Sequence, residues 1–217
     1  MIGVTVILFV INFWPIMLDG CELFRKRCKK MELEDGKKRC DWCNLDNELY
    51  VKYHDEEWGY PNFDEGYLFE MLILESFQAG LSWETILKKR ENFRQAFDDF
   101  DMDKIMLYDE EKIEELRNNK GIVRNRLKIT AAINNARIFK EIQGECGSFL
   151  EYLRGFTGDD IIYENDKTTS PLSEEISRDL RRRGMTFVGP TIIYSYLQAI
   201  GLINSHANEC FLYNDGS

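Results

Sequence analysis

The stretch that decides the fold runs from Tyr50 to Trp83 and reads YVKYHDEEWGYPNFDEGYLFEMLILESFQAGLSW. Its second half predicts a helix, because apolar residues recur at helical spacing between Leu68 and Leu74. Asp64 stands where an N-cap residue is favoured, and Gly80 marks the end of the pattern. The stretch also contains one of the two histidines and two of the four tryptophans of the chain. Polar groups beside aromatic rings are typical of a pocket for a flat, polar ligand.

Glu75 is a carboxylate inside this otherwise apolar helix pattern. It directly follows Leu74 and comes four residues after Met71, so it lies at the edge of the buried stripe or inside it. The pattern alone favours a glutamate at the solvent edge of an amphipathic helix. The other interpretation is a buried carboxylate, which is costly without a partner and therefore indicates a ligand site.

The rest of the chain predicts helices as well. No alternating pattern typical of strands occurs in residues 39–217, so the sequence predicts an all-α fold. The 217 residues suffice for one domain or two small lobes with a buried core. Further helices are predicted from Ser82 to about Phe97, after Asp101, after Asp109, from Arg124 or Asn125 to Glu141, from Ser173 to Gly184, and from Pro190 onward.

Charge is distributed unevenly along the chain. The net charge of −10 argues mildly against a nucleic-acid partner. From Arg117 to Lys140, however, seven Lys or Arg residues occur and no Asp or Glu. Gly121 separates two predicted helices there, so the segment resembles a helix-hairpin-helix with a basic surface for phosphates. A solvated basic helix face is the alternative. The residues expected to contact DNA are Lys120, Gly121, Arg124 and Arg126; Arg181–Arg183 form a second, weaker candidate.

The six cysteines do not form a dense disulfide pattern, which favours a cytosolic protein with reduced or metal-bound thiols. Cys40 and Cys43 form Cys-x2-Cys, and His206 and Cys210 form His-x3-Cys. Both spacings are typical of tetrahedral zinc sites. His54 is the only other histidine, and it offers an alternative to Cys43. Spacing alone favours Cys43.

Several long blocks resemble the bacterial DNA-3-methyladenine glycosylase I family, in the same order as in that family. They are YHDEEWG, LFEMLILESFQAGLSW, GIVRNRLKITAAINNAR and RRRGMTFVGPTIIYSYLQAIGLINSH. The resemblance extends from Arg39 to about Tyr213. It implies a single glycosylase domain over residues 39–217, folded as a helix-hairpin-helix glycosylase-like bundle. The family's hairpin shares the departure seen here, where Gly121-Ile122-Val123 replaces the usual Gly-hydrophobic-Gly.

The resemblance also implies one structural zinc per chain. The zinc would join the N-terminal and C-terminal segments, an arrangement we call the zinc staple. The family's ligand pattern matches Cys40, His54, His206 and Cys210 and leaves Cys43 as a reserve ligand. Four protein ligands leave no open coordination position, so the expected role is structural.

The activity implied by the resemblance is excision of 3-methyladenine from alkylated DNA, by flipping the nucleotide out and hydrolysing its bond to the sugar. The positions that match the family's base-binding residues are Tyr53, Glu75 and Trp83, with Glu75 as the catalytic carboxylate. No Asp occurs between Asn118 and Gly158, and no lysine has an obvious Schiff-base position. The sequence therefore predicts a monofunctional glycosylase without strand cleavage.

Residues 1–38 form a leader that the resemblance does not cover. Val4 to Leu18 is apolar but short for a membrane-spanning helix, and basic residues follow it rather than precede it. That order suits a membrane anchor with its basic end inside. We favour the other interpretation, in which the start codon is placed too far upstream and Met31 is the true start. Deletion of residues 1–30 is then expected to leave activity intact.

The expected partner is double-stranded alkylated DNA. We expect no nucleotide cofactor, no membrane association, a monomer and a cytoplasmic location. The competing hypothesis is a non-catalytic, zinc-stapled helix-hairpin-helix module that only binds DNA. That hypothesis accounts for the basic segment and the Cys/His set, but it gives no reason for Tyr53, Glu75 and Trp83 to occur together.

Overall fold

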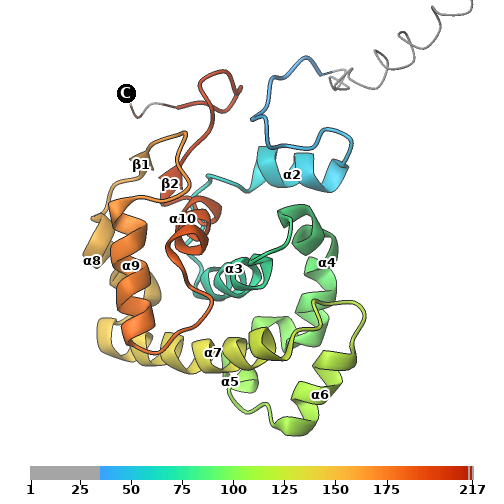
Figure 1. Cartoon of the computed structure of the whole chain (residues 1–217). Coiled ribbons are helices and arrows are strands. Elements are labelled where there is room, and N and C mark those ends of the chain that lie inside the picture. The colour runs from blue at the N-terminus through green and yellow to red at the C-terminus, as the bar shows by residue number, and fades with distance from the viewer. Residues whose placement is uncertain (1–34, 215, 217) are drawn as a thin grey trace, which may run out of the picture.

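The structure, a computed structural model, describes residues 35–214 and Gly216. The expectations about the leader therefore fall almost wholly outside the described residues. Within the described part the chain is mostly helical, as predicted (Figure 1). Its helices are α2 (Glu48–Glu56), α3 (Glu65–Gln78), α4 (Trp83–Ala96), η1 (Asp98–Phe100), α5 (Met102–Ile105), α6 (Glu110–Asn118), α7 (Arg126–Cys146), α8 (Phe149–Thr157), α9 (Pro171–Arg182) and α10 (Pro190–Ala199).

Helix α3 lies at the centre of the molecule, with α4, α7 and α10 around it (Figure 1). Every residue from Leu68 to Phe77 is buried. A helix that is buried on all sides has no solvent edge, because neighbours cover the polar and apolar faces alike. The Asp64 carboxylate accepts from the backbone N–H of Tyr67 at 3.0 Å, which confirms the predicted N-cap.

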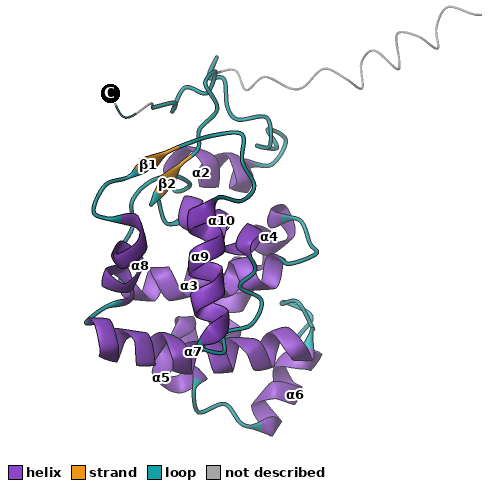
Figure 2. Cartoon of the chain, turned by 60° about the vertical axis from the view of Figure 1, so that its left-hand side comes forward, coloured by secondary structure: helices purple, strands orange, loops and turns teal. Residues whose placement is uncertain are grey.

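The long helix α7 runs along one end of the bundle, against α5, α6 and α8 (Figure 2). Its Phe139 ring stacks on Phe149 of α8, with ring centroids 3.9 Å apart. Helix α10 packs most extensively on α9 and also on α3. No helix in the described part of the chain is both long enough and apolar enough to cross a membrane.

Several local predictions need correction. The sequence patterns missed α2 and α8 altogether. Helix α9 begins at Pro171, with Ser170 as the N-cap; Ser173, predicted as the cap, is the reciprocal partner in a capping box with Ser170. Two short strands, β1 (Ile162–Tyr163) and β2 (Ile203–Asn204), pair in parallel although no strand was predicted. Two-residue strands are too short to produce a readable alternation.

The N-terminal and C-terminal segments lie together at the end of the molecule opposite α6 and α7 (Figures 1 and 2). The backbone N–H of Phe211 donates to the carbonyl of Lys38 at 2.8 Å. Helix α2 lies next to these two segments (Figure 1). Residues from positions near 40, 54 and 206 are thereby brought into one small region.

Candidate functional site

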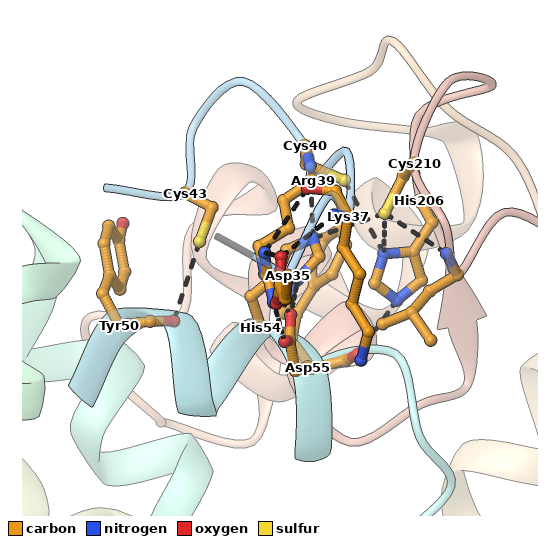
Figure 3. Close-up of polar contacts among 12 residues, drawn as sticks. Asp35, Lys37, Arg39, Cys40, Cys43, Tyr50, His54, Asp55, His206 and Cys210 are labelled. Carbon is orange, nitrogen blue, oxygen red and sulfur yellow. Dashed lines mark hydrogen bonds and ion pairs between the residues drawn. The ribbon is translucent and has the colours of Figure 1, made fainter. Parts of the chain in front are cut away.

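Cys40, His54, His206 and Cys210 form a buried cluster between these segments (Figure 3). Their ligand atoms all lie within 4.8 Å of one another. The Cys210 sulfur is 3.5 Å from His54 Nε2 and 3.6 Å from His206 Nδ1, and the Cys40 sulfur is 3.6 Å from His206 Nδ1. In a tetrahedral zinc site with ordinary zinc–sulfur and zinc–nitrogen bond lengths, a sulfur ligand and a nitrogen ligand lie about 3.5 Å apart. The donor set and its spacing therefore fit a four-coordinate metal.

The two histidines are oriented by contacts on their far sides. His54 Nδ1 donates to the Asp55 carboxylate at 2.8 Å, which leaves Nε2 facing the cluster. His206 does the reverse, because its Nε2 donates to the carbonyl of Trp58 at 3.2 Å and its Nδ1 faces the cluster. Arg39 binds Asp55 through Nε at 2.8 Å. Such outer contacts fix the tautomer and the ring orientation of metal-binding histidines.

Burial sets the protonation of the cluster. It lowers the pKa of His206 to about 4 and also lowers the pKa of His54. Both imidazoles are therefore neutral near pH 7, which is the form that binds metals. Burial raises the pKa of the Cys40 thiol to about 12, so a thiolate here needs a cation beside it.

Cys43, the residue that spacing alone favoured, lies outside the cluster. Its sulfur points toward the carbonyl of Tyr50 at 3.9 Å (Figure 3). The turn from Cys40 to Cys43 is closed by a backbone hydrogen bond, and this turn directs the Cys43 side chain toward α2. The fourth member of the cluster is therefore His54 and not Cys43, although Cys43 is nearer to Cys40 in the sequence.

Glu75 lies inside the protein, and the solvent-edge interpretation is wrong. Only 3% of its surface is exposed. Its Oε2 atom has no hydrogen-bond partner among the described residues. Burial raises the pKa of this carboxyl to about 8. An unpartnered buried carboxyl is costly, and such sites are retained mainly for function.

Tyr53 and Trp83 are in ring contact, and Glu75 acts electrostatically on Tyr53. Their ring centroids are 5.3 Å apart, with the planes inclined at 50°. Tyr53 is buried, and burial raises its phenol pKa well above the ordinary value, with the charge of Glu75 as the second cause. The indole N–H of Trp83 is buried and unpartnered among the described residues. The structure thus brings the rings of Tyr53 and Trp83 together, and it leaves an acceptor on Glu75 and the donor on Trp83 unpaired among the described residues.

Further aromatic residues, which the sequence argument did not select, lie beside the Cys/His cluster. The Trp42 ring is 5.5 Å from Tyr50, 5.2 Å from His54 and 4.7 Å from Trp58. Trp42 remains 38% exposed. Burial raises the pKa of Tyr50 to about 12, and the charge of Glu75 contributes. The density of aromatic residues from 42 to 60 was the available signal for these positions.

The predicted DNA-binding residues lie in and beside the turn between α6 and α7. Lys120 and Arg124 are exposed, and no ion pair holds either side chain within residues 35–214. Arg126, in contrast, is paired with Glu110 and Glu114 of α6, each at 2.6 Å. A Cβ atom on Gly121 would lie 3.0 Å from Asn119 Oδ1 and 3.1 Å from the Asn92 side chain, so a side chain here would force one of these neighbours to move.

Two other parts of the basic segments are engaged within the protein. Lys128 is buried, and its ammonium donates to the carbonyls of Phe77 and Ala79. Of the second candidate group, Arg182 and Arg183 both bind Asp179. Arg181 is exposed at the end of α9. Acidic neighbours therefore neutralise much of the charge that looks unopposed in the linear sequence.

Comparison with known proteins matches this chain to one family. The family described as methyladenine glycosylase matches residues 42–213. The DNA-3-methyladenine glycosylase 1 of Escherichia coli strain K12 is 42% identical over 181 residues, which cover 81% of this chain and 96% of that protein. The DNA-3-methyladenine glycosylase of Haemophilus influenzae is 38% identical over 180 residues, covering 79% of this chain and 96% of that protein.

Solved structures agree with the sequence comparison. A crystal structure of 3-methyladenine DNA glycosylase I superimposes with a TM-score of 0.78 at 43% identity. The match covers 82% of this chain and 100% of that chain. The Staphylococcus aureus enzyme, solved to explain its recognition of 3-methyladenine, gives a TM-score of 0.76 at 33% identity, with 80% of this chain and 97% of that chain covered. Sequence and fold therefore lead to the same result: this chain belongs to the methyladenine glycosylase family.

Proposed function

We propose that this protein is a base-excision glycosylase that flips out and hydrolytically releases 3-methyladenine from alkylated double-stranded DNA. The observation that carries the proposal is Glu75, a buried carboxyl whose Oε2 atom has no partner among the described residues, together with the paired rings of Tyr53 and Trp83. A cationic, planar base with polar edges is the kind of ligand that would satisfy all three side chains. Family membership supports the same reaction.

Release of 3-methyladenine does not require a strong general acid. Methylation at N3 puts a positive charge on the base, so the base leaves as a neutral molecule and the bond to the sugar is already weak. The protein must remove the nucleotide from the stack and bind the departing base more tightly as the bond breaks. A cationic base beside Glu75 would favour the ionised form of its carboxyl, which accepts hydrogen bonds from the base and stabilises the positive charge of the base.

The aromatic pair holds the base in place. Trp83 offers a face for stacking, with a cation–π contribution while the base is charged. Tyr53 provides a second aromatic contact. Because all three side chains are enclosed, bulk water is kept away from the base and the electrostatic contribution of Glu75 is strengthened. No strand cleavage follows in this proposal, since no nucleophilic amine is assigned to the site.

The Cys/His cluster is proposed to hold one structural zinc. Cys40, His54, His206 and Cys210 would be its four ligands. The metal would supply a crosslink between the two terminal segments and no reaction chemistry, because a fully protein-ligated zinc has no open position. Ligand spacing near that of a tetrahedral site and two neutral imidazoles support this assignment.

The turn between α6 and α7 is proposed to bind the DNA backbone as a helix-hairpin-helix element. Lys120 and Arg124 would contact phosphates, with Gly121 allowing close approach and Arg126 shaping the start of α7. The exposed cations at the turn support the proposal. We further propose that the protein acts as a monomer in the cytoplasm.

Release of free base from methylated duplex DNA by the purified full-length chain, separated by chromatography, tests the proposal. The expected product is 3-methyladenine, with little 7-methylguanine. Glu75→Gln is the matched inactive variant, because it keeps the shape of the side chain. If the folded, zinc-loaded protein binds DNA but releases no base, the non-catalytic binding module is the correct description.

A further inference from the structure

Lys128 is a lysine of the basic segment that cannot reach DNA. It is the third residue of α7, and only 6% of its surface is exposed. Its ammonium donates to the carbonyl of Phe77 at 2.8 Å and to that of Ala79 at 2.6 Å. The Phe187 ring lies over it, with its centroid 5.8 Å from Nζ. A buried ammonium carries a desolvation cost, so its two acceptors are what stabilise it there.

The two carbonyls that accept from Lys128 belong to the C-terminal end of α3. In a continuing helix the Phe77 carbonyl would accept from Leu81, but the Leu81 N–H bonds to Gln78 instead, at 2.6 Å. The last turn of α3 contains no basic residue of its own. Lys128 therefore provides, from another helix, both the donors and the positive charge that favour a helix C-terminus.

This helix end lies between the two halves of the proposed base pocket. Glu75 lies on the last turn of α3, and Trp83 is the first residue of α4. Only Ala79 to Ser82 separates the two helices. A group that fixes the backbone at Phe77 and Ala79 therefore fixes how Trp83 is placed relative to Glu75.

We propose that Lys128 is a positioning residue for base excision, whose ammonium holds the turn between α3 and α4 so that Glu75 and Trp83 face the same base. It is not a phosphate contact, although it belongs to the basic segment. The inference rests on the proposed function, because the turn matters for catalysis only if Glu75 and Trp83 bind the base. It separates Lys128 from Arg124, which is an exposed residue of the same segment just before α7.

The test compares Lys128→Met with Lys128→Arg, with Lys104→Met as a surface lysine control on α5. Lys128→Met is expected to lower the single-turnover rate of base release by roughly tenfold or more, because a misplaced binding group has large kinetic effects. The affinity for DNA and its salt dependence should stay unchanged. Lys128→Arg should restore part of the rate, and Lys104→Met should match the unaltered protein.

Two further measurements separate the alternatives. Arg124→Met is expected to reduce the slope of log affinity against log salt by about one, as loss of a phosphate contact does. A similar reduction with Lys128→Met would overturn the inference. Backbone hydrogen exchange over residues 79–83 should accelerate in Lys128→Met but not in Lys104→Met; unchanged exchange would also overturn it.

The failure of the proposed function gives a different result. If the unaltered protein releases no base, that function is wrong, while the exchange measurement still reports whether Lys128 holds the turn. If the unaltered protein is active and Lys128→Met is equally active, only the role of Lys128 is wrong. Should Lys128→Met fail to fold, Lys128→Gln, which keeps N–H donors but removes the charge, carries the same comparison.

Discussion

Glu75 is a residue whose environment links stability to pH. Burial raises its pKa from about 4.5 in the unfolded chain to about 8 in the folded protein. Between these two values the folded protein holds a proton that the unfolded chain has lost. The contribution of Glu75 to stability is therefore favourable at low pH and declines as the pH rises toward 8.

Glu75→Gln should remove this decline. We expect the free energy of unfolding of the unaltered protein to fall by about 1.4 kcal/mol per pH unit more steeply than that of the variant between pH 4.5 and 8. Denaturant titrations at several pH values measure the difference. The same variant should lose affinity for free 3-methyladenine in calorimetry. Parallel stability curves together with unchanged base affinity would show that Glu75 is neither protonated nor a base contact.

Asp55 acts on the Cys/His cluster through His54. Asp55→Asn weakens the acceptor for His54 Nδ1 and removes the charge that faces Arg39. We expect a metal affinity lower by roughly 10–100-fold, the usual effect of losing such an outer contact. Competition with a chelator measures it. Asp46→Asn, an exposed acid of the same segment, should keep full affinity; equal losses in both variants would contradict the role of Asp55.

At the scale of elements, the turn between α6 and α7 depends on Gly121. The carbonyls of Lys120 and Gly121 accept from the ammonium of Lys89, and Asn119 accepts from the Gly121 N–H at 2.8 Å. The Lys89 ammonium therefore holds the turn against α4, and the Asn119 side chain closes the turn itself. A side chain at position 121 has no room unless Asn92 or Asn119 moves.

Gly121→Ala should weaken DNA binding by displacing this turn. We expect several-fold lower affinity for duplex DNA and a loss of about 1 kcal/mol in stability, as for overpacking at a tight contact. Gly144→Ala is the matched control, since it lies in α7 with open space around it. That change should stabilise the protein by about 0.5–1 kcal/mol. Normal DNA affinity in a destabilised Gly121→Ala protein would show that the turn does not contact DNA.

At the scale of the whole molecule, the cluster joins two segments that are far apart in the sequence. Cys40 precedes α2, and Cys210 follows the last strand. Apart from the cluster, few polar contacts join these segments, among them Phe211 to Lys38 and an exposed ion pair between Lys38 and Glu209. A metal that binds only the folded arrangement contributes its binding energy to folding.

Metal removal should therefore act first on this end of the molecule. Chelation is expected to lower the Tm and to make residues 35–60 and 203–214 sensitive to protease before the rest of the chain. Cys40→Ala should abolish binding of one zinc per chain, whereas Cys43→Ala should retain it, because the Cys43 sulfur points away from the cluster. Loss of zinc in Cys43→Ala alone would reverse the ligand assignment.

The sequence by itself determined the helical fold class, the family and several of the local helix starts. The caps at Asp64, Ser82 and Asp109 were readable because a cap is a contact within one turn of its own helix. The tertiary structure alone decided which groups are enclosed. Glu75 is buried because other helices surround α3, and His54 rather than Cys43 meets Cys210 because α2 turns it inward. Lys128 likewise faces the end of α3 and not solvent. These outcomes depend on contacts between distant segments, whereas spacing reports only on neighbours.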